Sequence, residues 1–123
     1  MQETYAQSHP KAAIKVKFFE PFQRSLVALQ GPKSAESLQK VTNVDLKSLY
    51  FMQSIVASVC GVELCRITRC GYTGEDGFEI SIPSIKAVDI TNEILKDDNV
   101  KLAGLGARDS LRFVWVHSTV LVR

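Results

Sequence analysis

An alternation of apolar and polar residues, directly after a glycine-rich turn, constrains the fold of this chain more than any other feature. Phe78, Ile80 and Ile82 alternate with Glu79 and Ser81, which is the period of a strand with one buried face. Three glycines at a spacing of three residues precede this strand, and glycine permits backbone conformations with positive φ. The segment therefore predicts a sheet that has one face on the core and Glu79 on the opposite face.

Shorter apolar runs bounded by turn residues predict further elements around this strand. Cys60 and Gly61 separate two of the runs and are typical of the tight turn of an antiparallel hairpin. We interpret the order of elements as a ferredoxin-like βαββαβ unit of the α+β class, an antiparallel sheet with helices on one face. The predicted strands are 25–29, 54–59, 62–68, 78–82 and 100–105, and the predicted helices are 35–40, 87–95 and a last one from residue 106 onward.

The helix predicted at residues 87–95 has a start signal and an apolar face. Ser84 follows Pro83, and serine is a favourable N-cap residue. Helical spacing then defines the residues that we expect to face the core. They are Ala87, Val88, Thr91, Ile94 and Leu95.

Charge and hydropathy argue against two classes of partner. The chain has 15 basic and 13 acidic residues, and residues 1–24 and 110–123 carry its basic excess. Nucleic-acid binding needs a basic patch on the folded body, so we predict no nucleic-acid partner. The longest apolar stretches fall far short of the ~20 residues that span a bilayer, so we predict no membrane partner.

The three cysteines, Cys60, Cys65 and Cys70, are odd in number and spaced by five. An odd count without an apolar signal peptide favours a reducing compartment and free thiols. Zinc sites typically use closely spaced pairs of cysteine or histidine, which this spacing lacks. We therefore predict no metal site and interpret the cysteines as structural thiols.

Two residues of the glycine-rich segment are candidates for ligand binding. The carboxylate of Glu79 could accept two parallel N–H bonds from a flat heterocycle, and the alternative is a solvated glutamate on the outer face of the sheet. Tyr72 is either a stacking surface for a ring or an aromatic residue that packs the turn. Glu75 and Asp76 would repel phosphate, so the turn does not fit a phosphate-binding loop.

Arg108 is the third candidate, in the first turn of the helix predicted from residue 106. A lone cation is disfavoured there by the helix dipole. The position therefore predicts a partner carboxylate, either Asp109 or an anionic ligand.

A longer pattern runs through four segments of the chain. These are Leu-Gln-Gly-Pro at 29–32, Leu-Tyr-Phe-Met at 49–52, residues 65–81 with the run Arg-Cys-Gly-Tyr-Thr-Gly-Glu-Asp-Gly, and residues 104–112. The pattern closely resembles the aminomethyltransferases, the T-proteins of the glycine cleavage system. The resemblance implies that residues 25–112 are a fragment of the folate-binding domain of that family, preceded by a loosely ordered lead-in at 1–24 and followed by a divergent tail at 113–123.

The resemblance also implies an activity and a set of partners. The family transfers the one-carbon unit from the aminomethyl-lipoyl arm of H-protein to tetrahydrofolate, which gives 5,10-methylenetetrahydrofolate and ammonia during glycine catabolism. It uses no metal and works in the mitochondrial matrix of eukaryotes, although no presequence is visible in this chain. By motif position, Glu79 would hold the N–H edge of the pterin, Tyr72 would line the folate pocket, and Arg108 would be a binding-site arginine.

The chain departs from the family pattern at the residue that carries the chemistry. The essential aspartate of the family lies upstream of the matching region, and residues 1–24 do not reproduce its motif. We therefore assign no catalytic residue in this chain and expect it to be inactive alone. The alternative is a non-catalytic α+β module that binds folate or protein and competes with the full enzyme for H-protein.

Two other families share parts of the pattern. An RNA-recognition domain has a similar order of elements, but it needs aromatic residues and a basic face where this chain has Glu75, Asp76 and Glu79. The folate-binding domains of sarcosine and dimethylglycine dehydrogenases are closer rivals, and the run Cys-Gly-Tyr-Thr-Gly-Glu-Asp-Gly favours the T-protein.

Overall fold

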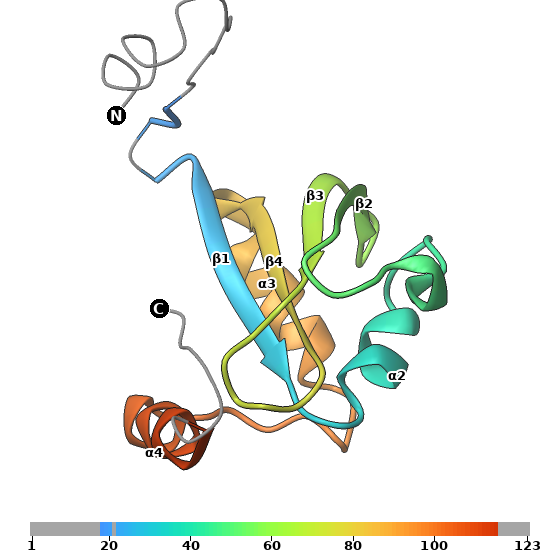
Figure 1. The fold of residues 1–123 in the computed structure, drawn as a ribbon. Helices are drawn as coiled ribbons and strands as arrows, with labels where there is room; N and C mark the ends of the chain where they lie inside the picture. The colour runs from blue at the N-terminus through green and yellow to red at the C-terminus, as the bar shows by residue number, and fades with distance from the viewer. Residues whose placement is uncertain (1–17, 21, 116–123) are drawn as a thin grey trace, which may run out of the picture.

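The computed structural model describes residues 18–20 and 22–115, in which four strands form one antiparallel sheet (Figure 1). The order of the strands across the sheet is β1-β4-β3-β2. The α+β class and the antiparallel sheet are thus confirmed. The strands are β1 (Arg24–Gln30), β2 (Ser54–Val59), β3 (Val62–Arg69) and β4 (Gly77–Pro83), the helices are α2 (Ser34–Gln39), α3 (Ala87–Ile94) and α4 (Leu105–Trp115), and two 3-10 turns are η1 (Leu46–Ser48) and η2 (Ser84–Lys86).

Strand β4 lies in the interior of the sheet, between β1 and β3, and has the alternation predicted for it. Phe78, Ile80 and Ile82 are fully buried, whereas Glu79 and Ser81 are half-buried on the other face. Such an alternation gives a strand one face for the core and one for a polar environment.

Helices α2 and α3 pack on the buried face of the sheet. Leu38 of α2 and Ile90 and Ile94 of α3 belong to the same hydrophobic cluster as the buried residues of β4. The opposite face carries Glu79 and is more open, since Leu26 and Ala28 on β1 and Arg66 on β3 are exposed there. Helices α2 and α3 therefore cover one side of the sheet, as predicted.

The order of elements departs from βαββαβ because the strand predicted at 100–105 is absent. Residues 100–104 have no regular structure, and Leu105 begins α4. Leu102 and Leu105 are mostly exposed, and only Val100 of this run packs against the core. A short apolar run does not by itself distinguish a strand from the start of a helix.

Helix α3 begins at Ala87 as predicted, but its N-cap and one residue of its predicted buried face differ from the prediction. Ser84 is not the N-cap of α3: it begins the turn η2, and its hydroxyl pairs with that of Ser25 at 2.8 Å. The turn η2 lies between Ser84 and Ala87, and Lys86 takes the N-cap position of α3. Ala87, Ile90 and Ile94 are spaced by three and four residues and face the core, whereas Val88 is exposed.

The hairpin predicted at residues 60 and 61 joins β2 to β3. Cys60 has φ of 50° and Gly61 has φ of 74°, and positive values at both central residues define the type I′ turn that suits twisted antiparallel strands.

The predicted terminal segments lie mostly outside the described residues. Strand β1 begins at Arg24, the last residue of the predicted lead-in, and residues 113–115 of the predicted tail form the end of α4. The boundaries at 24 and 112 stay predictions.

Candidate functional site

The glycine-rich loop, residues 70–76 between β3 and β4, crosses the end of β1 (Figure 1). Two residues at that end hold the loop. The side-chain amide of Gln30 donates to the carbonyl oxygens of Cys70 at 3.1 Å and Phe78 at 3.4 Å, and the N–H of Gly31 donates to the carbonyl of Asp76 at 2.8 Å. The start and the end of the loop are thereby tied to one point of β1.

Two glycines of this segment lie against the side chain of Gln30. A Cβ atom on Gly71 or on Gly77 would overlap the carboxamide of Gln30, which would then have to move. Gly74, at φ of 83°, adopts a backbone conformation that other residues rarely adopt. The glycine spacing seen in the sequence therefore reflects both a sharp turn and the close approach of a side chain.

A salt bridge between Arg69 and Asp76 closes the base of the loop. Nε and Nη2 of Arg69 donate to the two carboxylate oxygens of Asp76 at 2.8 and 2.6 Å, and Nη1 donates to the carbonyls of Leu46 and Leu49 at 3.2 and 2.9 Å. The guanidinium carbon also lies 5.4 Å from the centroid of the Phe78 ring. One side chain therefore connects the loop, the turn η1 and the core, and bidentate pairs of this kind are the strong ones.

Because of this salt bridge, we expect part of the free energy of unfolding to be lost in acid. The Arg69 guanidinium lowers the pKa of Asp76 below its ordinary value. The salt bridge therefore stabilises the fold fully above the pKa of an unfolded aspartate, and this stabilisation is lost as the pH falls through the lower pKa of the folded state. Between pH 6 and pH 2, the free energy of unfolding should fall by about 1 kcal/mol less in Asp76→Asn than in the wild type. Urea unfolding measures the difference.

The control for this experiment is Asp89→Asn, which removes an exposed carboxylate paired with Lys86 at 3.3 Å. We expect this variant to keep the acid sensitivity of the wild type. An identical acid-induced loss in Asp76→Asn and Asp89→Asn would show that the Arg69 salt bridge does not carry the effect.

The loop places Tyr72 against Arg108. The side chain of Tyr72 is buried, with 7% of it exposed, and the guanidinium carbon of Arg108 lies 4.5 Å above the centroid of its ring. This is the geometry of a cation–π contact. Among the described residues Arg108 forms no ion pair with Asp109, so the aromatic face is the observed partner in place of that carboxylate.

Tyr72 and Arg108 line a cavity of about 540 Å³ between β1, α3, residues 99–103 and α4. Most of its wall is apolar, its basic residues are Lys33, Lys101 and Arg108, and none of its described lining residues is acidic. The hydroxyls of Ser34 and Tyr72 are buried without a hydrogen-bond partner among the described residues. Buried polar groups are normally satisfied, so the cavity has the size and the polar groups for an anionic ligand with an apolar body.

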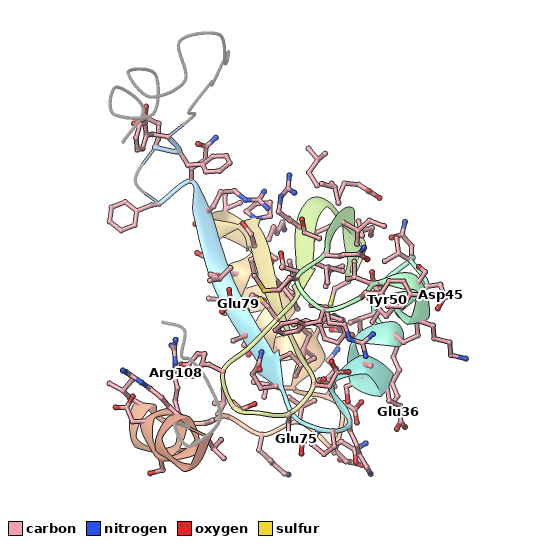
Figure 2. All side chains as sticks on the ribbon, in the orientation of Figure 1. Glu36, Asp45, Tyr50, Glu75, Glu79 and Arg108 are labelled. Atoms are coloured by element: carbon pink, nitrogen blue, oxygen red, sulfur yellow. The ribbon has the colours of Figure 1, made fainter. Side chains whose placement is uncertain are left out.

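Glu79 lies on the open face of the sheet and does not line the cavity. Its partners in the register are Ala28 on β1 and Thr68 on β3. Figure 2 shows Glu79 on β4 and Arg108 on α4. Because Ala28 also lines the cavity, Glu79 is one strand away from its border.

Cys70 adjoins Glu79 on this part of the sheet. Burial raises the pKa of the Cys70 thiol, and the negative charge of Glu79 raises it further. The thiol is therefore held in its neutral form, which is a poor nucleophile and a poor metal ligand.

Three residues that organise the site were missed in the sequence: Gln30, Arg69 and Asp76. Gln30 acts on backbone carbonyls that are 40 and 48 residues away in the sequence, and no spacing pattern signals such a contact. Arg69 and Asp76 flank the loop with opposite charges, which was an available signal for an ion pair across its base.

The described residues give no cluster of metal ligands and no membrane-spanning helix. Within residues 18–20 and 22–115, no group of three or more histidine, cysteine, aspartate or glutamate side chains is arranged to hold a metal ion. No helix in the same ranges is long and apolar enough to cross a bilayer. The three cysteines are free thiols, of which Cys65 is buried and the other two are half-buried.

Comparison with known proteins gives a family match over nearly the whole chain. Residues 3–118 match the family described as the GCVT N-terminal domain. The chain is 57% identical over 93 residues to the mitochondrial aminomethyltransferase of Homo sapiens and 55% identical over 93 residues to that of Mus musculus, and each match covers 76% of this chain and 23% of the relative. It is 51% identical over 92 residues to the mitochondrial aminomethyltransferase of Pisum sativum, covering 73% of this chain and 22% of that protein.

The chain thus spans about a quarter of the length of these relatives. Among solved structures, it is similar to the glycine cleavage system aminomethyltransferase T of Bartonella henselae at 22% identity and a TM-score of 0.40, over 74% of this chain and 48% of the other.

Proposed function

The chain belongs to the family of the GCVT N-terminal domain, and from this premise we propose that it is the tetrahydrofolate-binding part of a glycine cleavage aminomethyltransferase. In the proposed reaction, the one-carbon unit passes from the aminomethyl-lipoyl arm of H-protein to tetrahydrofolate. The products are 5,10-methylenetetrahydrofolate, ammonia and the dihydrolipoyl arm. We place the reaction in the mitochondrial matrix, with lipoylated H-protein and tetrahydrofolate as partners and without a metal.

The observation that carries the proposal is the stacked pair of Tyr72 and Arg108 on the wall of a cavity without acidic lining residues. Tetrahydrofolate has a flat pterin, an aromatic linker and carboxylates at its far end. A stacked aromatic ring supports a flat group, and a guanidinium without a carboxylate partner suits an anionic group. We assign Tyr72 to the wall of the folate pocket and Arg108 to the binding of the ligand.

Glu79 is proposed to bind the N–H edge of the pterin. Its carboxylate stands on the open face of the sheet beside Ala28, which belongs to the cavity wall. A carboxylate accepts two parallel N–H bonds in a charge-assisted pair. A ligand could therefore reach from Glu79 over β1 to Arg108.

We assign binding and no catalytic step to the residues of this chain. Neither Glu79 nor Arg108 is proposed to move a proton, and the reacting carboxylate of the family has no counterpart among the assigned residues. We expect the isolated chain to release no ammonia when it is incubated with aminomethylated H-protein and tetrahydrofolate. Ammonia release at the rate of a complete aminomethyltransferase would contradict this assignment.

Glu79→Gln is expected to weaken the binding of tetrahydrofolate by about 10- to 100-fold, because a hydrogen bond to a charged group contributes about 1.5–3 kcal/mol. The measurement is calorimetric titration of the chain with tetrahydrofolate under anaerobic conditions. Glutamine keeps the size of the side chain but loses its charge and one acceptor, so the fold should be unaffected.

The matched control is Glu75→Gln, which removes the charge of an exposed residue of the glycine-rich loop, four residues before Glu79. We expect it to bind tetrahydrofolate as the wild type does. Equal affinities of Glu79→Gln and the wild type would remove Glu79 from the site. A wild-type chain that binds H-protein but not tetrahydrofolate would replace the proposal with the protein-binding module.

A further inference from the structure

We propose that Gln30 is a positioning residue of this site: its carboxamide ties together the two ends of the glycine-rich loop and so holds Tyr72 under Arg108. The consequence for tetrahydrofolate rests on the proposed function, whereas the consequence for the position of Tyr72 does not. Gln30 also lines the cavity, so the position of Tyr72 is tested by a readout that needs no ligand.

The chemistry of a primary amide fits this task. Gln30 has two N–H donors on one nitrogen, and that nitrogen faces two carbonyl oxygens, those of Cys70 and Phe78. The reversed orientation would place the amide oxygen against both carbonyls, so the contacts fix which end is nitrogen. A carboxylate offers no donor at neutral pH and a methionine of similar length offers none at any pH.

The loop is shaped around this amide. Gly71 and Gly77, one at each end of the loop, leave no room for a Cβ atom beside the carboxamide of Gln30. The neighbouring Gly31 adds a third bond, from its N–H to the carbonyl of Asp76. Gln30, the last residue of β1, and the following Gly31 thus provide three hydrogen bonds to the ends of the loop.

Tyr72 depends on the loop backbone for its position. Its hydroxyl is buried without a hydrogen-bond partner among the described residues, so no hydrogen bond of its own anchors the phenol. It lies two residues after Cys70, whose carbonyl is an acceptor of Gln30. Loss of the amide would let the loop open locally and would displace the ring from the guanidinium of Arg108.

The test compares Gln30→Met with Gln39→Met in the full chain. Gln39 is a matched control because its side chain also makes two hydrogen bonds to the backbone, to the carbonyl of Val44 and from the N–H of Leu46, away from the glycine-rich loop. The first readout is nitration of Tyr72 by tetranitromethane, quantified by peptide mass spectrometry, with the exposed Tyr50 as internal reference (68% exposed). The second is the dissociation constant for tetrahydrofolate.

We expect Gln30→Met to raise the nitration rate of Tyr72 relative to Tyr50 by about fivefold or more, since a local loss of ~1 kcal/mol changes the open population by that factor. We expect the same variant to bind tetrahydrofolate about tenfold more weakly. Gln39→Met should change neither value, although it also loses two hydrogen bonds. If the loss of any two such hydrogen bonds were sufficient, both variants would change the nitration rate and the dissociation constant by similar factors.

A folded Gln30→Met chain with unchanged nitration of Tyr72 would overturn the proposal. If circular dichroism shows that Gln30→Met does not fold, Gln30→Asn against Gln39→Asn makes the same comparison, because asparagine keeps the donors but is one methylene too short. A wild-type chain that does not bind tetrahydrofolate would defeat the proposed function, and the nitration result would still decide the role of Gln30.

Discussion

Replacing Phe78 by alanine is expected to remove about 3–5 kcal/mol from the free energy of unfolding. Phe78 is fully buried in an interior strand of the sheet and belongs to the hydrophobic cluster that joins the sheet to α2 and α3. The substitution loses the buried ring and leaves a cavity that an interior strand cannot collapse. It also removes the ring that lies 5.4 Å from the Arg69 guanidinium. Urea unfolding followed by far-ultraviolet circular dichroism measures the loss.

Domains have a stability of about 5–15 kcal/mol, so a loss of about 3–5 kcal/mol removes most of the stability at the lower end of that range. The control is Ile82→Val in the same strand, which should cost about 0.5–1.5 kcal/mol. A cost below about 1 kcal/mol for Phe78→Ala would mean that the cluster around β4 is not the core.

The sequence predicted the elements whose periodicity is decided locally. In β4, the period of two placed Phe78 in the core and Glu79 on the open face, because successive side chains of a strand point to opposite faces. The turn at Cys60 and Gly61 was predictable because a two-residue hairpin demands residues that tolerate positive φ.

The errors concern one residue on a helix face and a run without a partner strand. On α3, Val88 was expected in the core and Ile90 was not, although Ile90 keeps the spacing of three and four residues to Ala87 and Ile94. The apolar run at 100–105 had the composition of a strand, but whether it joins a sheet depends on an available edge, which local composition does not encode.

The candidate site was predictable as a set of residues and not as an arrangement. The chain folds so that Tyr72 and Arg108 are in contact, although they are 36 residues apart in the sequence. The sequence indicated a carboxylate as the partner of Arg108, whereas in the structure the partner is an aromatic ring. The residues that hold the loop act through backbone groups, and backbone groups carry no sequence signal. In the sequence, the close approach of the Gln30 carboxamide to the loop is reflected only in the glycines at positions 71 and 77.

Replacing Arg69 by methionine is expected to lower the free energy of unfolding by about 2–3 kcal/mol, measured by urea unfolding at pH 7. The substitution leaves the Asp76 carboxylate without its bidentate partner and the carbonyls of Leu46 and Leu49 without a donor. The side chains of Arg69 and Asp76 are 26% and 32% exposed, so water can replace part of what is lost. The cost should therefore be smaller than the 3–5 kcal/mol of a fully buried pair.

Arg66→Met is the control, since Arg66 is an exposed arginine of the same strand whose guanidinium donates to the hydroxyl of Ser54 at 3.3 Å. It should change the free energy of unfolding by less than about 0.5 kcal/mol. Adding Asp76→Asn to Arg69→Met should then cost less than Asp76→Asn costs in the wild type, because the carboxylate has already lost its partner. Additive losses in this double-mutant cycle, or equal losses in Arg66→Met and Arg69→Met, would mean that the loop is held by Gln30 and Gly31 without the salt bridge.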